Sequence, residues 1–344
     1  MSATQSVQAK SDGSLPVVAV GALGGTISMT TDDSGKGAVP TQNADSLVGS
    51  LARRYRIAVE TRDISLIGSP SMTIRLLLQA LDYAHDAVDR GAAGVVLTHG
   101  TDTLAESAYV LSLLWDRPEP LVLTGAMRPS DAPGADGPAN LTCALRCAAD
   151  PSMRGLGVLV CFADFVHSAT LCEKVDSTAV SAFASPGWGP VARVDAESVV
   201  HVMSPAFHFD ALPAPSADAP VRIPIITAAL DDDGSLLSLL NADTCDAVVV
   251  AGVGSGRMSV RAAEQAKRLV QRGVPVVFVR KPSHGTTTTA CYAYPGSESD
   301  LIAGGLLPGG LLSAEKTRLL LHVLLQAGYR GEALAAELRR RCLA

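Results

Sequence analysis

Short apolar segments alternate with amphipathic segments along most of the chain. Residues 16–20 and 94–97 are apolar runs bounded by glycine, which is typical of strands buried in a parallel sheet. Between such runs, apolar side chains recur every three or four residues, which predicts helices. We expect these helices at residues 43–53, 73–90, 102–115 and 136–149, with Thr73 as the N-cap of the second.

The alternation is interrupted at residues 209–221, which are rich in proline and lack periodicity. Beyond them the pattern predicts strands at 222–227, 246–251 and 274–280, and helices at 258–272, 313–327 and 331–342. We therefore predict an α/β protein with two domains. The divisions are a disordered tail (1–13), a larger N-terminal α/β domain with a mostly parallel sheet (14–209), a linker (210–221) and a smaller C-terminal α/β domain (222–344).

Composition and charge argue against nucleic-acid-binding and membrane proteins. The formal net charge of −6 argues against nucleic acid and against an anionic membrane as partners. The first 14 residues are polar, and no stretch is long and apolar enough to span a membrane, so we expect a cytoplasmic protein. The basic run at 339–341 is expected to be the solvated end of the last helix.

The seven cysteines show neither a disulfide framework nor a metal-ligand spacing. Cys143 and Cys147 lie one helical turn apart, without a pair of histidines beside them. We expect them to be buried thiols and expect no metal. Asp164 and His167 are likewise expected to belong to a hydrogen-bonded turn.

Two threonine-containing turns follow predicted strands and are the strongest sign of chemistry. The first is GGTIS at residues 24–28, and the second is THGTDT at residues 98–103. Ligands of open α/β sheets gather at the carboxyl ends of the strands, so both turns should reach one site. A threonine hydroxyl is a weak nucleophile until a base or a lowered pKa activates it. Asp102 is also expected to cap the helix at 102–115.

Three further segments accompany these turns: LTGAMRP at 123–129, ADGPANL at 135–141 and HSATLCEK at 167–174. In this order and spacing, the five segments resemble the bacterial-type L-asparaginases over roughly residues 15–340. The resemblance implies a Rossmann-like C-terminal domain, hydrolysis of asparagine to aspartate and ammonia through a threonine acyl-enzyme, and no cofactor. It also implies a homo-oligomer, a dimer or a tetramer built from dimers, in which a neighbouring subunit completes the site.

The same resemblance implies roles for individual residues. Thr26 would attack the side-chain amide, and Thr101, Asp102 and Lys174 would handle protons; which threonine attacks first stays open. The α-amino and α-carboxylate groups of the substrate would be held by residues at the same turns and by one acidic residue of the second domain. The expected substrate-binding residues are Gly25, Ser69, Pro70, Gly100, Asp102 and Glu298.

The sequence departs from the family pattern at three places, and these departures should affect substrate affinity and selectivity more than the catalytic step. Pro70 stands where many members carry glutamine, and it offers neither a side-chain amide nor a backbone N–H. Residues 29–42 contain no tyrosine, although the family's mobile loop often carries one. Ser255 and Arg257 occupy positions where members often carry asparagine.

Other functions remain as alternatives. Residues 18–25 have the spacing G-x-x-G-G rather than G-x-G-x-x-G, which argues against a dinucleotide site. An amino-acid-binding or sensor protein with weak activity is one alternative. The amidase subunit of a tRNA-dependent amidotransferase is another, although such subunits usually carry an extra N-terminal domain. Ammonia release from asparagine would distinguish an enzyme from a binding protein.

Overall fold

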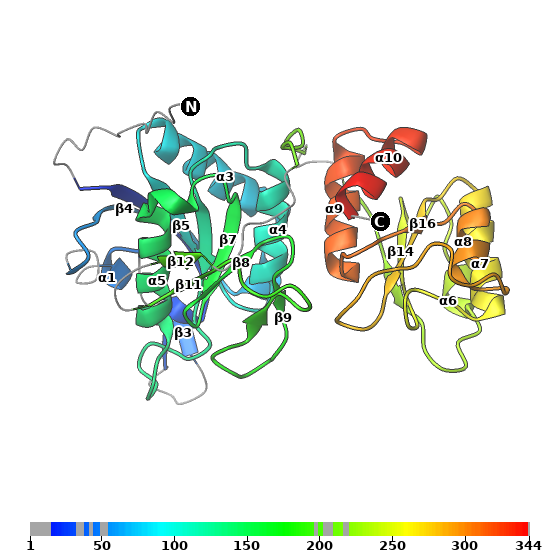
Figure 1. Cartoon of the computed structure of the whole chain (residues 1–344), viewed down its shortest axis with the longest axis horizontal. Helices are drawn as coiled ribbons and strands as arrows, with labels where there is room; N and C mark the ends of the chain where they lie inside the picture. Colours follow the sequence, from blue (N-terminus) through cyan, green and yellow to red (C-terminus); the bar gives the residue numbers. More distant parts are fainter. Residues whose placement is uncertain are drawn as a thin grey trace, which may run out of the picture.

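The computed structural model describes residues 15–31, 38–40, 44–48, 54–195, 199–201, 209–215 and 220–342. Within them the chain forms two α/β domains, each built around its own sheet, as the alternating pattern predicts (Figure 1). The expected disordered tail at 1–13 lies outside the described residues. So do most of the loop at 29–42 and part of the linker at 210–221.

The larger sheet has eight strands, of which five neighbours run parallel in the order β4-β1-β5-β6-β7. Three antiparallel strands, β8, β11 and β12, extend it at the β7 edge. The strands are β1 (Val17–Gly24), β4 (Ala58–Ile67), β5 (Gly94–Thr98), β6 (Leu121–Thr124), β7 (Val158–Phe162), β8 (Phe165–Ser168), β11 (Ala192–Val194) and β12 (Val199–His201).

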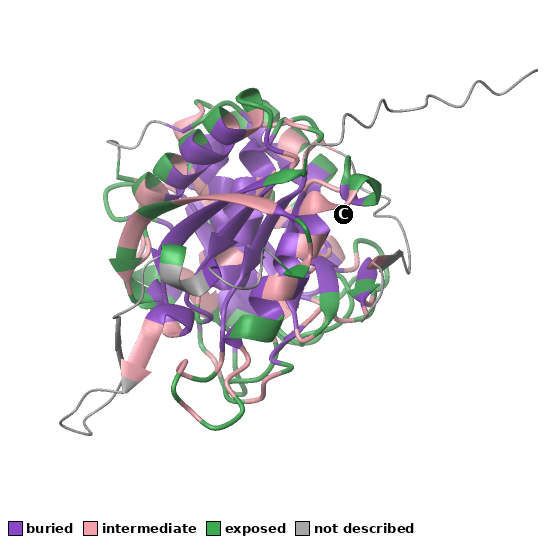
Figure 2. Cartoon of the chain, turned by 90° about the vertical axis from the view of Figure 1, so that its left-hand side faces the viewer, coloured by how far each residue is buried: buried purple, intermediate pink, exposed green. Residues whose placement is uncertain are grey.

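Helices cover both faces of this sheet, which explains why its central strands are apolar throughout. Val95 and Leu97 of β5 pack with α3 (Ile74–Asp89) and α4 (Leu104–Leu114). Val96 faces the other way and packs with α5 (Gly137–Ala149). The short helix α1 (Ala44–Val48) lies on that second face through Val48. Figure 2 shows the resulting buried layer of strands beneath helices whose outer turns are exposed.

The smaller sheet is parallel and has the order β13-β14-β15-β16. Helices α6, α7 and α8 pack on one face, and α9 and α10 pack on the other. The elements are β13 (Ile225–Thr227), α6 (Ser235–Ser238), β14 (Val248–Gly252), α7 (Val260–Gln271), β15 (Val276–Arg280), α8 (Glu298–Ala303), β16 (Leu307–Pro308), α9 (Ala314–Gln326) and α10 (Gly331–Cys342).

The two domains share one hydrophobic cluster. Leucines of α9, such as Leu320 and Leu324, belong to the cluster that includes Leu104 and Leu111 of α4. In Figure 1, α4 and α9 lie on the facing sides of the two domains. Burial of this apolar surface therefore holds the C-terminal domain against the helix that follows the THGTDT turn.

Short elements complete the described chain and supply most of the site. They are the single-turn helices η1 (Thr26–Ser28), η2 (Ser69–Ser71) and η3 (Pro151–Met153), and the two-stranded pairs β2 (Met29–Thr31) with β3 (Ala38–Pro40) and β9 (Glu173–Lys174) with β10 (Phe183–Ala184). None of the described helices is both long enough and apolar enough to cross a membrane.

The helix starts confirm one predicted cap and contradict another. The Thr73 side chain accepts a hydrogen bond from the backbone N–H of Leu76 at 3.3 Å, so it caps α3 as predicted. Asp102 was predicted to cap the next helix, and this is wrong. The N-cap of α4 is Thr103, which makes no side-chain cap bond, because the Asp102 carboxylate instead binds Lys174.

The predicted solvated basic run at the C-terminal end is wrong at one position. Arg341 is only 3% exposed, because the last turn of α10 lies against residues 209 and 210. Its guanidinium donates to the Asp210 carbonyl oxygen at 2.6 Å and lies over the ring of Phe209. Arg339 and Arg340 are exposed, as expected.

The thiols and the turn at residue 164 agree with prediction. Cys143 and Cys147 are free and buried. Ala163 and Asp164 both have positive φ and form the tight turn between β7 and β8, and Cys143 donates to Asp164 at 3.5 Å. His167 was predicted to belong to the same turn, and this is wrong: it lies in strand β8, where its ring binds the Ser185 hydroxyl at 3.0 Å. No group of histidine, cysteine, aspartate and glutamate side chains within the described ranges has the arrangement of a metal site.

Candidate active site

Strands β1 and β5 are neighbours, so the two threonine turns leave the sheet side by side. Ala22 of β1 is in register with Thr98 of β5, and the chain turns sharply after each strand. Gly25 has φ of 92° and ψ of 178°, a conformation that only glycine adopts readily. The glycine at this position therefore sets the direction in which the residue that follows it leaves the strand.

The backbones of three loops touch at this point. A Cβ atom on Gly25 would lie 2.3 Å from the Cα of Gly100, and one on Gly100 would lie 2.8 Å from the Ser69 side chain. Glycine is thus required at both positions by close approach. The packing brings η1, the THGTDT turn and η2 into contact, although they lie far apart in the sequence.

Thr26 begins the single-turn helix η1 and faces the space between these loops. The backbone N–H and the hydroxyl of Ser28 both bind the Gly25 carbonyl oxygen, at 3.0 Å and 2.8 Å, which closes the turn. Ile27 is buried in the hydrophobic cluster that includes side chains of α5, and this packing holds η1 against the domain core. The Thr26 side chain is left partly exposed at the edge of the cavity.

Lys174 reaches the second threonine turn from the β9–β10 pair. Its Nζ donates to Thr101 Oγ1 at 3.0 Å and to Asp102 Oδ1 at 2.8 Å. Thr101 is buried, whereas the side chain of Asp102 is 62% exposed and that of Lys174 is 17% exposed. A cation, a hydroxyl and a carboxylate are therefore in direct contact at the mouth of the cavity.

Ser69 joins η2 to the same turn. Its Oγ accepts a hydrogen bond from the Asp102 backbone N–H at 3.2 Å, and its carbonyl oxygen accepts one from the Thr103 hydroxyl at 2.8 Å. Because the Ser69 hydroxyl is the acceptor of the first bond, its hydrogen stays available to a ligand. Pro70 follows it and is exposed at the cavity.

These residues surround a polar cavity of about 230 Å³. Eight of the nine residues predicted from the sequence line it, and Glu298 does not. The sequence reasoning missed four further lining residues, although the segment at 123–129 contains one and another lies three residues after Lys174. The cavity is lined by Gly25, Thr26, Met29, Gly68, Ser69, Pro70, Gly100, Thr101, Asp102, Met127, Lys174 and Ser177.

Glu298 lies in the C-terminal domain of the same chain, where both of its oxygens have partners. Arg257 donates to Oε2 at 3.1 Å, and the backbone N–H groups of Cys291 and Tyr292 each donate to Oε1 at 2.8 Å. Burial alone would raise the pKa of Glu298, but these hydrogen bonds hold it below its ordinary range. Within one chain, this carboxylate braces its own domain.

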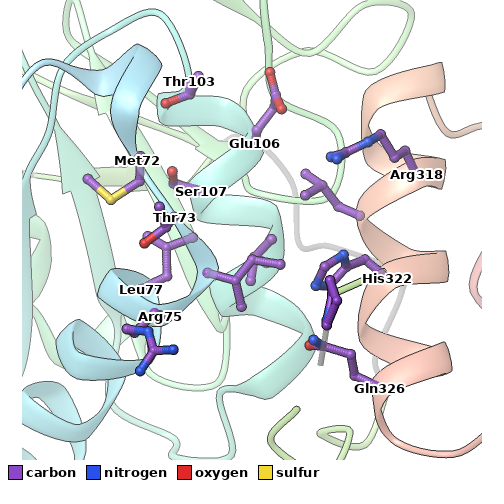
Figure 3. A pocket seen from close by; sticks show the side chains of 14 residues that line it. Met72, Thr73, Arg75, Leu77, Thr103, Glu106, Ser107, Arg318, His322 and Gln326 are labelled. Carbon is purple, nitrogen blue, oxygen red and sulfur yellow. The ribbon is translucent and has the colours of Figure 1, made fainter. Parts of the chain in front are cut away.

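A second, larger cavity lies between the domains, at α3, α4 and α9 (Figure 3). Its volume is about 670 Å³, and it combines apolar side chains such as Leu77 with charged ones such as Glu106 and Arg318. It touches the THGTDT turn only at Thr103. The hydrogen-bonded group of Lys174, Thr101 and Asp102 lines the smaller cavity instead, together with Thr26.

The chain matches known proteins over both domains. The model of the N-terminal asparaginase domain matches residues 17–206, and that of the glutaminase/asparaginase C-terminal domain matches residues 222–337. A probable L-asparaginase of Deinococcus radiodurans is 32% identical over 322 residues, which cover 92% of this chain and 94% of that relative. One subunit of a glutamyl-tRNA(Gln) amidotransferase from Haloquadratum walsbyi is 32% identical over 87% of this chain and 69% of its own length.

A solved structure gives the same result. The crystal structure of a probable cytoplasmic L-asparaginase from Campylobacter jejuni superimposes with a TM-score of 0.80 at 27% identity, covering 95% of this chain and 99% of the other. The predicted resemblance and the predicted α/β fold are therefore confirmed. The chain belongs to the asparaginase family.

Proposed function

We propose that this protein hydrolyses L-asparagine to L-aspartate and ammonia through an acyl-enzyme on Thr26. The observation that carries the proposal is the hydrogen-bonded group of Lys174, Thr101 and Asp102, which lines the same 230 Å³ cavity as Thr26. A nucleophile, a proton-handling pair and a carboxylate are the groups that amide hydrolysis requires. The family membership of the chain supports the same reaction.

In the first half-reaction, the Thr26 oxygen attacks the side-chain amide carbon of asparagine. The Thr26 hydroxyl proton passes to the Thr101 oxygen as the Thr101 proton passes to Lys174 in its neutral amine form. Lys174 then returns a proton to the amide nitrogen, which departs as ammonia. An aspartyl ester of Thr26 remains. In the second half-reaction, a water molecule attacks the ester carbon, the ester bond breaks, and Thr26 recovers its proton as aspartate is released.

Thr26 suits the role of first nucleophile better than Thr101. Thr101 is buried and already accepts the hydrogen bond from Lys174, whereas Thr26 stands partly exposed at the start of η1. The Lys174 ammonium next to Thr101 Oγ1 favours the deprotonated form of that hydroxyl. Thr101 is therefore placed to relay a proton rather than to form the ester.

The charged groups of the amino acid find complementary partners around the cavity. Asp102 has an exposed carboxylate that can bind the α-ammonium group, and the free hydrogen of the Ser69 hydroxyl can bind the α-carboxylate. Gly25 and Gly100 allow the backbone to approach the substrate closely. Pro70 adds shape but no hydrogen-bond donor.

The wider setting is proposed from the same resemblance. We place the protein in the cytoplasm, as a homotetramer built from dimers and working without a cofactor. We also propose the domain boundaries expected from the sequence: a tail that ends at residue 13, an N-terminal domain that ends at 209, a linker that ends at 221 and a C-terminal domain after it. Glu298 would act on substrate only if a neighbouring copy brings it to this cavity.

The test measures both products from purified protein. Ammonia and aspartate should appear in equal amounts from L-asparagine, and neither should appear with the Thr26→Ala variant. Binding of asparagine without turnover would instead support the sensor function. Ammonia release that requires glutamyl-tRNA and a partner protein would support the amidotransferase function. We consider that function because the chain is similar to the Haloquadratum walsbyi amidotransferase subunit.

A further inference from the structure

His99 precedes the glycine of the THGTDT turn and does not line the cavity. Its side chain is completely buried. The ring nitrogen Nδ1 lies 2.7 Å from the carbonyl oxygen of Gly100. A carbonyl can only accept, so Nδ1 must carry the hydrogen, and in the neutral ring Nε2 is then the unprotonated nitrogen.

The rest of the ring environment keeps this histidine neutral. Nε2 is buried and has no hydrogen-bond partner among the described residues. Burial lowers the pKa of His99 to about 4, although the bond to Gly100 opposes the shift. The ring therefore acts as a fixed neutral donor in ordinary buffers and takes no part in proton transfer.

The carbonyl that His99 holds belongs to the peptide linking Gly100 to Thr101. A trans peptide is planar, and its N–H points away from its carbonyl. Because the carbonyl points at the buried ring, the Thr101 N–H points the opposite way, towards the cavity that Gly100 and Thr101 line. No described residue accepts a backbone hydrogen bond from this N–H.

We propose that His99 is a positioning residue that fixes the Gly100–Thr101 peptide so that its N–H is available to the oxyanion of the tetrahedral intermediates. Gly25 and Ser69 confine the Gly100 backbone from two sides, but neither bonds to its carbonyl oxygen. The His99 ring is the group that determines which way this peptide faces. The inference rests on the function proposed above.

Two substitutions test the hydrogen bond that His99 donates to the Gly100 carbonyl oxygen. His99→Asn keeps an N–H group at the δ position, where it can bind the Gly100 carbonyl. His99→Leu has the same branching at Cγ but a larger side chain and no donor. Leucine fills more of the space left by the ring than asparagine does, so a loss of kcat confined to the leucine variant reports on the hydrogen bond and not on the cavity.

Steady-state kinetics with L-asparagine should separate the pair. We expect His99→Leu to lower kcat at least about tenfold with KM within about threefold, because the lost alignment matters most where charge develops. His99→Asn should keep kcat within about threefold of wild type, even if thermal unfolding shows it to be the less stable variant. Equal kcat values for the two variants, or kcat values that follow stability, would contradict a positioning role.

Crystal structures of the two variants supply a readout that needs no activity. The Gly100 carbonyl should keep its direction in the asparagine variant and rotate or become disordered in the leucine variant. An unmoved peptide in His99→Leu would overturn the inference whatever the substrate is. Absence of asparagine hydrolysis in the wild-type protein would instead overturn the proposed function and leave the structural comparison standing.

Discussion

The two sheets of the molecule end in similar glycine-containing loops whose polar groups have different partners. After β1 and β5, hydroxyl and carboxylate groups face a cavity, and the Asp102 side chain remains largely exposed. After β14, the loop at residues 252–257 folds back on itself, and its polar groups bind within the same domain. Ser255 pairs with Thr288, and Arg257 pairs with the buried Glu298.

This difference separates groups that are available for chemistry from groups that support the fold. The Glu298 carboxylate is buried and has donors on both oxygens within its own domain, whereas Asp102 and Thr26 are open to a ligand in the cavity. The comparison predicts that changes in the first region reduce catalysis with little loss of stability. Changes in the second region should do the reverse.

The largest expected effect is on kcat in Thr26→Ala. Removal of the attacking oxygen should lower kcat by at least about 10⁴-fold, as for other nucleophiles that act with a base. Thermal unfolding should be nearly unchanged, because Gly25 and Ser28 close the turn. A purified variant that kept more than a tenth of the wild-type ammonia release would show that Thr26 is not the nucleophile.

Lys174→Met should have the second-largest effect on kcat. Loss of the proton-handling group should lower kcat about 10²- to 10⁴-fold, with a smaller effect on KM. Lys316→Met offers a contrasting buried lysine, whose Nζ binds the carbonyl oxygens of Thr170 and Cys172 and should matter for stability. If Lys174→Met turned over within about twofold of wild type, the ion pair with Asp102 would be only a surface contact.

Glu298→Ala should act mainly on stability. Arg257 would lose its partner, but its side chain is 23% exposed, so the loss of stability should be at most the roughly 3–5 kcal/mol that breaking a fully buried pair costs. Glu332→Ala is the matched control, because its pair with Arg339 is exposed and should be worth less than about 1 kcal/mol. Denaturant unfolding measures both values.

The kinetic result of the same variant decides whether Glu298 binds substrate, as the family resemblance implies. We expect the folded fraction of Glu298→Ala to keep its kcat/KM for asparagine. A tenfold or larger loss of kcat/KM in protein of unchanged stability would show that the carboxylate reaches substrate, which requires a neighbouring copy.

The pH dependence of stability tests two buried histidines of the N-terminal domain. Burial lowers the pKa values of His99 and His167 from 6.5 to about 4. Between these values the unfolded chain binds more protons than the folded chain, so the free energy of unfolding must fall as pH decreases. We expect a loss of about 2 kcal/mol per histidine between pH 7 and pH 5. His99→Asn should remove about half of this dependence, and equal slopes in the two proteins would contradict the assignment.

Pro70→Gln should have the smallest effect. A glutamine amide beside Ser69 would donate one hydrogen bond to the charged α-groups, and a bond of this kind is worth at least about 1.5 kcal/mol. The contact lies away from the scissile amide, so KM should fall about tenfold while kcat hardly changes. An unchanged KM, in a variant whose η2 turn is unmoved, would show that residue 70 does not face the substrate.

Many features of the fold and of the site could be predicted from the sequence, because local sequence patterns determine them. The parallel strands, the Thr73 cap and the position of the threonine turns at the carboxyl ends follow from periodicity and turn chemistry. The family resemblance implied nine site residues, of which eight line the cavity at these turns. Three of the eight, Ser69, Pro70 and Lys174, come from segments that are distant in the sequence.

The remaining features depend on contacts between distant segments. Asp102 does not cap α4 because Lys174, 72 residues away, attracts its carboxylate. Arg341 is buried because the chain at residue 210 crosses the end of α10. The internal pairing of Glu298 and the packing of His99 against Gly100 likewise require the folded backbone, and no spacing in the sequence predicts them.

The proposed mechanism requires Thr26 to carry the aspartyl group during hydrolysis. Rapid acid quenching during turnover of L-asparagine, followed by proteolysis and mass spectrometry, measures this directly. We expect one aspartyl adduct, on the peptide containing Thr26, which forms faster than aspartate is released and disappears when asparagine is exhausted. An adduct on the peptide containing Thr101, or undiminished turnover in the Thr26→Ala variant, would contradict it.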